Sequence, residues 1–143
     1  MKVKIKRFID QPIISPLLSN EIGSNINGPS LIRVPDWITD PLGEYYLYFA
    51  DHKGDRIKLA YSDNLSGPWK IHVGGTLHLK KSHFLINEPD IPDDFDLAEL
   101  GPRDAHPDQI PHIPEKISDL THPHIASPDV HINEDNRLVI MYY

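Results

Sequence analysis

Alternating apolar and polar residues divide the first half of the chain into four short predicted strands. We expect them at residues 30-34, 45-50, 57-62 and 69-73. Runs of Pro, Gly, Asp and Asn separate neighbouring strands and are typical of turns and short loops. Four short strands joined in this way predict one up-and-down antiparallel sheet, which is the unit of a propeller blade.

A second unit of the same kind begins late in the chain. In the run 128-133, Val130 and Ile132 fall on one face of a strand, and Asp129, His131 and Asn133 fall on the other. A short turn then leads into an apolar strand at 138-143. The run 127-133 repeats the pattern of 28-34, and 138-143 corresponds to 45-50. This internal repeat favours a propeller or another array of repeated strands.

The segments outside these units complete a single-domain division of the chain. Residues 1-27 form a lead-in, 28-73 blade one, and 124-143 the start of blade two. Residues 74-123 are rich in proline, which predicts a long functional loop or lid, with a disordered linker as the alternative. Within it, 77-79 and 84-86 are candidate short strands, and 94-100 and 114-120 are candidate helical turns. Because the chain stops inside an apolar strand, we expect it to be a fragment.

Composition limits the possible functions. The formal net charge of -7 argues against binding to nucleic acid or anionic membranes. The absence of cysteine excludes thiol chemistry and disulfides. No signal peptide or membrane-spanning segment is visible, so the cytoplasm is the default location. No cofactor is expected. No metal site is expected either, because His122, His124 and His131 lack a carboxylate frame.

Four runs carry a resemblance to a known family. Gly28-Pro29-Ser30-Leu31-Ile32, residues 45-50 and the run 57-69 resemble the first blade of five-bladed β-propeller glycosidases. These are glycoside hydrolase family 43 and relatives such as families 32, 62, 68 and 117. Residues 126-130 are similar to the start of their second blade. The resemblance covers 28-73 and 124-143, and it implies an all-β fold: a fragment of a five-bladed propeller with a long proline-rich insertion.

The resemblance also assigns catalytic roles. The family uses an Asp base on blade one, an Asp on blade two that tunes the acid, and a Glu acid on blade three. Asp129 falls on the blade-two position and is the candidate catalytic residue. The Glu is expected beyond Tyr143. The position of the base is Gly28, preceded by Asn27. Neither side chain ionises, so the sequence departs from the pattern required for standard inverting hydrolysis.

Topology gives further candidates. If the strands run up and down in order, the start of the first strand, the turn after the second and the long segment before Asp129 share one end of the sheet. Asn27, His52 and His124 are therefore candidate substrate-binding residues beside Asp129, because sugar sites combine carboxylates with groups that bind hydroxyls. The alternative for Asp129 is a cap of the strand entry, and for His52 a solvated turn residue. Trp69 and the tyrosines at 45, 46, 48 and 61 are expected in the core.

Together these observations predict a glycoside hydrolase-like protein that acts on a carbohydrate at the central channel of a propeller. The alternative is a non-catalytic propeller that binds a glycan or a protein partner, and the absence of a base at Gly28 favours it. This stretch alone is expected to be inactive. A Glu opening a third blade would favour the enzyme.

Overall fold

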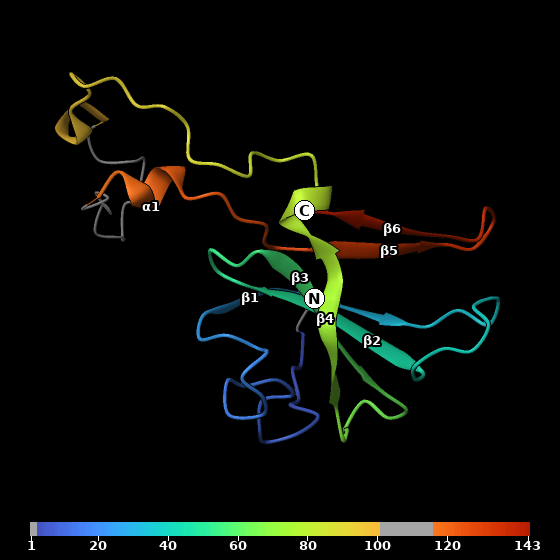
Figure 1. Ribbon diagram of the computed structural model, residues 1–143. Helices are drawn as coiled ribbons and strands as arrows, with labels where there is room; N and C mark the ends of the chain where they lie inside the picture. Colours follow the sequence, from blue (N-terminus) through green and yellow to red (C-terminus); the bar gives the residue numbers. More distant parts are fainter. Residues whose placement is uncertain (1–2, 101–115) are drawn as a thin grey trace.

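The computed structural model describes residues 3–100 and 116–143, which form two antiparallel sheets and three short helical segments (Figure 1). Strand is the predominant secondary structure, as expected for an all-β chain. The elements are β1 (Ile26–Arg33), β2 (Tyr45–Asp51), β3 (Arg56–Ser62), β4 (Lys70–His78), η1 (Leu79–Lys81), η2 (Leu97–Leu100), α1 (Ser118–Thr121), β5 (Asp129–Asn133) and β6 (Leu138–Tyr142).

The sheet topology confirms the predicted strand order. The first sheet has the order β1-β2-β3-β4, with each neighbour antiparallel, and β5 pairs with β6 in a separate two-stranded sheet. Ile26 lies opposite Asp51, and Arg56 lies opposite His78. The start of β1, the β2–β3 turn and the end of β4 therefore share one end of the sheet, here called the entry end. The loop after β1 and the β3–β4 turn lie at the far end.

Strand β1 begins at Ile26, before its expected start at residue 30 and inside the expected lead-in, and strand β4 continues past its expected end at residue 73. Leu59 pairs with His72, but Ile57 pairs with Leu77, so the chain bulges out between these two pairs. Gly74 and Gly75 occupy this bulge with positive φ angles of 90° and 69°. Glycine adopts such angles without steric cost, so the strand leaves the ladder and then rejoins it. Residues 74–78 therefore belong to the sheet and not to the predicted loop.

Alternation along the strands gives the first sheet two apolar faces. On one face Tyr48, Ala50, Ile57 and Leu59 form a core with Val130 of β5, and Ile132 and Met141 pack against it. The β5–β6 hairpin therefore covers this face (Figure 1). Each large side chain that is fully buried there contributes on the order of 1.5–3 kcal/mol relative to an exposed one.

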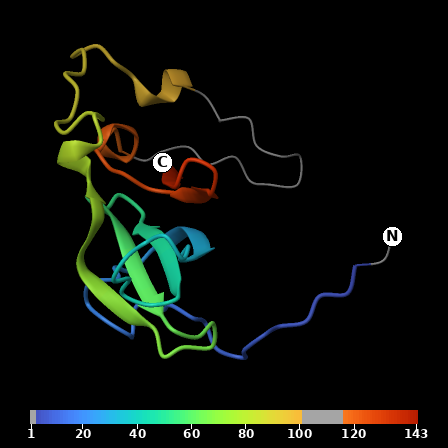
Figure 2. The ribbon, with the colours of Figure 1, turned by 90° about the vertical axis from the view of Figure 1, so that its right-hand side faces the viewer.

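The opposite face is covered by the lead-in. Leu47, Phe49 and Ala60 pack with Ile22, and both Phe49 and Ile22 are fully buried. The Lys58 ammonium group also donates a hydrogen bond to the Glu21 carbonyl. The second half of the lead-in is thus part of the core, whereas its beginning runs away from the sheets as an extended segment (Figure 2).

The described parts of the segment between β4 and β5 project beyond the two sheets (Figure 1). The candidate strand at 84–86 is wrong, because these residues form no ladder. The predicted helical turns correspond to the single turns η2 and α1. Residues 101–115 of the predicted lid lie outside the described residues. Every helix in the ranges 3–100 and 116–143 is too short to cross a bilayer.

Candidate functional site

The entries of β1 and β5 have the same unusual backbone and lie against each other. Gly28 has φ 55° and Ser127 has φ 54°, and each precedes a proline. A Cβ atom added at Gly28 would lie 2.3 Å from the Ser127 Cα. The hydroxyl oxygen of Ser30 accepts a hydrogen bond of 2.8 Å from the Val130 N–H. The two runs that repeat in the sequence therefore also share a backbone conformation. The contacts between them join the two sheets at the entry end.

This contact leaves no room for a side chain at position 28. Any side chain there would require the backbone of Ser127 to move, and a residue other than glycine at this φ would be strained. Asn27, the preceding residue, pairs with Ala50 in the ladder. Its side-chain oxygen is buried and has no hydrogen-bond partner among the described residues. It therefore does not present that oxygen to solvent.

The structure brings His52 and His124 together at the entry end. Their ring centroids are 5.7 Å apart with an interplanar angle of 65°. The His52 N–H donates to the Asn25 carbonyl at 2.8 Å, and the Ile125 N–H donates to the Gly54 carbonyl at 3.1 Å. Backbone hydrogen bonds therefore hold in place both the turn that carries His52 and the segment that carries His124.

An ion pair attaches α1 to the same turn. The Lys53 Nζ lies 2.7 Å from Asp119 Oδ1. The hydrogen bond from Lys53 lowers the pKa of the Asp119 carboxyl below its ordinary value, against a smaller opposing effect of desolvation. Because the side chains of Lys53 and Asp119 are 32% and 39% exposed, solvent and salt screen this pair, and it orients α1 more than it stabilises the fold.

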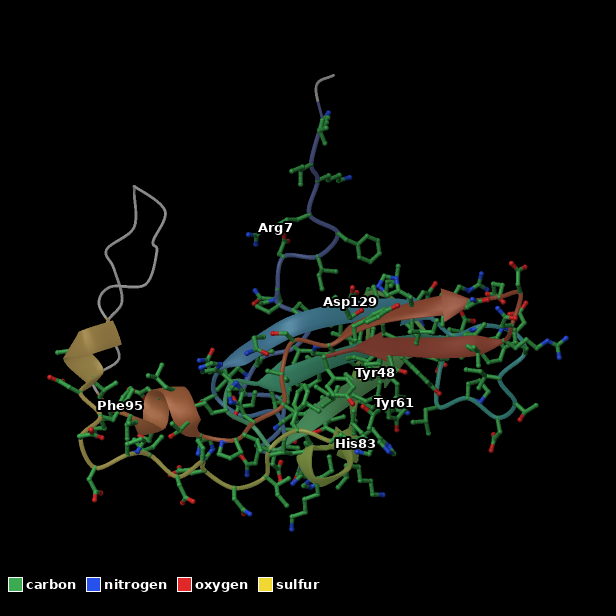
Figure 3. All side chains as sticks on the ribbon, turned by 90° about the horizontal axis from the view of Figure 1, so that it is seen from above. Arg7, Tyr48, Tyr61, His83, Phe95 and Asp129 are labelled. Atoms are coloured by element: carbon green, nitrogen blue, oxygen red, sulfur yellow. The ribbon has the colours of Figure 1, made fainter. Side chains whose placement is uncertain are left out.

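Asp129 stands at the start of β5 with its side chain 65% exposed. Its Oδ2 lies 2.8 Å from Nε2 of His131, two residues further along the same face of the strand. Figure 3 shows its position on the hairpin, far from Phe95 of the projecting segment. Among the described residues, its hydrogen-bond partner is His131 and none of Asn27, His52 or His124.

The entry end therefore holds two groups of candidate residues, not one. His52 and His124 form the first. Asp129 and His131 form the second, and the ring of Tyr142 lies 5.9 Å from that of His131. The residues 129, 131 and 142 share the exposed face of the hairpin because Asp129 lies opposite Tyr142 in the ladder. The alternation of the two predicted strands already places these residues on one face, but the site prediction left out His131 and Tyr142.

Three of the five aromatic residues expected in the core pack there, whereas Tyr45 and Tyr61 are half-buried and belong to neither buried cluster. Tyr48 is 7% exposed, Tyr46 packs beside it, and Trp69 packs on the face covered by the lead-in. Burial, together with the nearby Tyr46, raises the pKa of Tyr48 to about 12. Within the described ranges, no three side chains of His, Asp or Glu are grouped so that they could hold a metal ion.

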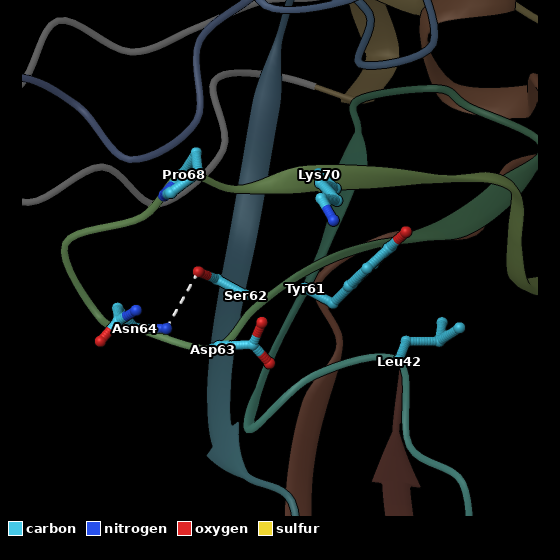
Figure 4. Close-up of a pocket in the computed structure, with 7 residues that line it drawn as sticks. All are labelled: Leu42, Tyr61, Ser62, Asp63, Asn64, Pro68 and Lys70. Atoms are coloured by element: carbon cyan, nitrogen blue, oxygen red, sulfur yellow. Dashed lines mark hydrogen bonds between the residues drawn. The ribbon is translucent and has the colours of Figure 1, made fainter.

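The concave regions at the far end of the sheets include two that are lined by residues of the turns there. The first is lined by residues around the β3–β4 turn, including Tyr61, Asp63 and Lys70, and the Asn64 N–H donates to the Ser62 hydroxyl beside it (Figure 4). The second lies between the sheets, where Trp37 Nε1 donates a hydrogen bond of 2.7 Å to Glu134. Neither includes a residue of the entry end.

Comparison with known proteins gives one distant relative. No family model matches the chain, and no solved structure matches it. The chain is similar to an uncharacterized protein of Acanthamoeba polyphaga mimivirus, with 28% identity over 149 aligned residues that cover 97% of this chain and 34% of the relative. The chain thus spans about a third of the length of this curated relative.

Proposed function

We propose that the chain forms the first blade and the start of the second blade of a β-propeller, and that the protein binds carbohydrate at the entry end of β1 and β5. The observation that carries this proposal is the pairing of two like strand entries, in which Gly28 lies against Ser127 and Ser30 binds Val130. In a propeller, the first strand of each blade lines the central channel, so two neighbouring blades bring their first strands side by side.

The polar groups at this end suit a sugar. Asp129 offers an exposed carboxylate, and the imidazole of His52 on the β2–β3 turn lies beside that of the half-buried His124 in the segment before β5. Carboxylates and imidazoles accept hydrogen bonds from hydroxyl groups, which are the main polar feature of a neutral glycan. A carbohydrate is therefore the ligand class that this mixture of exposed acceptors supports best.

Hydrolysis of a glycosidic bond is the second candidate activity. It is favoured by the exposed Asp129 carboxylate, which stands where the resemblance to glycoside hydrolase family 43 implies a residue that tunes the general acid. A neighbouring carboxylate raises the pKa of such an acid through like-charge repulsion. The contact at Gly28 favours binding over hydrolysis as the first candidate, because it leaves no room for the base that the same resemblance implies.

The test uses the intact protein at its natural length, with Asp129→Asn as the variant and Asp135→Asn as the control. Asp135 is an exposed carboxylate in the turn of the same hairpin, at the far end. Binding is measured on an array of plant, algal and microbial glycans and then by calorimetry. Turnover is measured with aryl arabinoside, xyloside and galactoside.

We expect binding of a neutral glycan by the wild type. If hydrolysis also occurs, Asp129→Asn should reduce turnover by about a hundredfold or more, in line with general acid–base contributions. It should weaken binding much less, because an amide oxygen still accepts a hydrogen bond from a hydroxyl. Asp135→Asn should match the wild type in both assays. A protein that neither binds any arrayed glycan nor hydrolyses any glycoside would contradict the proposal.

A further inference from the structure

Part of the chain that precedes β5 lies against the β2–β3 turn. Residues 116–127, here called the strap, run from α1 to the start of β5 (Figure 1). The Ile125 N–H donates a hydrogen bond of 3.1 Å to the Gly54 carbonyl, and Lys53 Nζ lies 2.7 Å from Asp119 Oδ1. One backbone hydrogen bond and one ion pair therefore connect the strap to the turn.

Two histidines meet at the same boundary. His52 stands on the turn and His124 on the strap, with their ring centroids 5.7 Å apart. Nδ1 of His124 lies 2.8 Å from the carbonyl oxygen of His122. Because a carbonyl oxygen only accepts hydrogen bonds, Nδ1 carries the proton of the neutral ring, and Nε2 takes up the second proton on acidification. The bond to His122 is therefore kept when His124 becomes charged, and the ring stays fixed on the strap.

Acidification places like charges on the two rings. Histidine is the side chain whose charge ordinarily changes between about pH 5 and pH 8. Among the described residues, neither of the two rings hydrogen-bonds to the other, so no shared proton compensates for a second charge. At a separation of 5.7 Å, two unit charges near a protein surface repel each other enough to change an equilibrium constant by roughly tenfold. The repulsion acts between the strap and the turn.

The other charged groups at this end do not cancel the repulsion. Each nearby carboxylate has a partner other than the two rings: Asp51 accepts from the Ser24 and Asn25 N–H groups, Asp55 contacts Arg56 and His78, Asp119 contacts Lys53, and Glu88 lies 3.8 Å from His122. The pKa of the Asp119 carboxyl lies below its ordinary value of 3.8, so its pair with Lys53 stays ionised at about pH 5. Lys116, at the start of the strap, is a cation and adds no compensating charge.

We propose that the contact between His52 and His124 is a pH-sensitive latch that holds the strap on the β2–β3 turn. The latch is closed when the rings are neutral and opens when both are protonated. This inference rests on the proposed carbohydrate binding and adds its regulation. His52 and His124 both belong to the proposed site, so opening of the latch separates two of its polar groups. Glycan binding therefore falls as the pH falls.

One substitution removes a charge from the latch but keeps its contact. His52→Phe leaves an aromatic ring beside His124 and allows only one charge in the pair. The alternative, His124→Phe, would also remove the hydrogen bond to His122, so position 52 gives the cleaner test. His72→Phe is the matched control, because His72 is a half-buried histidine that pairs with Leu59 in the middle of the first sheet and not at the entry end.

Hydrogen exchange of the intact protein at about pH 8 and about pH 5 measures the latch directly. The Ile125 amide reports on the strap, because its hydrogen bond to Gly54 lies directly after His124. Amides in the centre of β2 and β3 provide the internal reference, since their exchange follows the opening of the whole sheet. In the wild type and in His72→Phe, we expect the Ile125 protection factor, relative to this reference, to be about tenfold lower at the acidic pH. In His52→Phe it should be the same at both pH values.

Calorimetry at the same two pH values tests the link to binding, with the neutral glycan that the array selects at about pH 8 as the probe. The affinity of the wild type should fall by about tenfold at the acidic pH. In His52→Phe the ratio of the two affinities should be close to one, whatever the affinity at the higher pH.

The outcomes separate this inference from the proposed function. If the Ile125 protection factor in the wild type is the same at both pH values, or falls equally in His52→Phe, the latch is wrong and the proposed function stands on the array result. If the latch opens but the glycan affinity does not fall, the latch does not regulate the site and the inference is overturned. If no glycan binds at either pH value, the proposed function falls together with the regulatory role, and the exchange result alone decides whether the latch exists.

Discussion

The contact between Gly28 and Ser127 predicts that Gly28→Ala, which adds a single methyl group, strongly lowers the free energy of unfolding. In Gly28→Ala, the new Cβ would lie 2.3 Å from the Ser127 Cα and 2.9 Å from the Ser127 carbonyl carbon. Both atoms are backbone, so the β5–β6 hairpin must shift to relieve the overlap. Overpacking of this kind costs about 1–3 kcal/mol. A left-handed backbone conformation costs a residue with a Cβ about 1–2 kcal/mol more. The expected loss of unfolding free energy is therefore about 2–5 kcal/mol.

The chain contains a matched control for the cost of placing a residue with a Cβ at a positive φ. Gly74 also has a positive φ, 90°, but an added Cβ there meets nothing within 4 Å. Gly74→Ala should therefore cost only the conformational term of about 1–2 kcal/mol. Urea unfolding followed by circular dichroism and tryptophan fluorescence measures both variants, and the midpoints are compared at equal slope. If Gly28→Ala destabilises the protein no more than Gly74→Ala, the packing between the strand entries is not as described.

Three further predictions concern the packing and the titration of single residues. Trp37→Phe removes the hydrogen bond to Glu134 and should lower the unfolding free energy by about 0.5–1.5 kcal/mol in the same urea assay, while Glu134→Gln, which keeps an acceptor, should lower it less. Tyr48 has a pKa raised to about 12 in the folded state, so the stability it gives by staying protonated is complete below its ordinary value of 10.0 and is lost as the pH rises towards 12. Tyr48→Phe should therefore lessen the loss of stability over this alkaline range, and an unchanged curve would contradict the burial of the phenol. Asp119 has a lowered pKa, so its contribution is present above the unfolded value and is lost as the pH falls through the folded pKa. In Lys53→Met, an NMR titration should show the Asp119 pKa rising towards 3.8, whereas an unchanged pKa would contradict the ion pair.

The sequence predicted the strands well because their signal is local. The apolar run 45–50 and the alternating run 128–133 each match an observed strand to within one residue. The end of β4 was missed for a physical reason. Gly74 and Gly75 indicate a turn in any local reading, but the pairing of Leu77 with Ile57 restores the strand beyond them, and that pairing is a long-range interaction.

The candidate site was predicted only in part, because its geometry depends on contacts between distant segments. Strand order alone predicts that His52 and His124 lie at one end of the sheet, and their ring centroids are 5.7 Å apart there. Strand order could not reveal that the Asn27 side-chain oxygen is buried. Nor could it show that Asp129 turns towards His131, because that depends on side-chain torsion angles.

The measurement that tests the account most directly is an NMR titration of backbone amides with a neutral glycan selected on the array. Amide shifts identify where the ligand lies without requiring turnover. We expect the largest shifts at Ser127 and Asp129, with further shifts at His52 and His124, because these residues stand at the entry end of β1 and β5. Shifts centred on Arg33, Trp37 and Glu134 at the far end, or no shifts at a saturating glycan concentration, would contradict a carbohydrate site at the entry end.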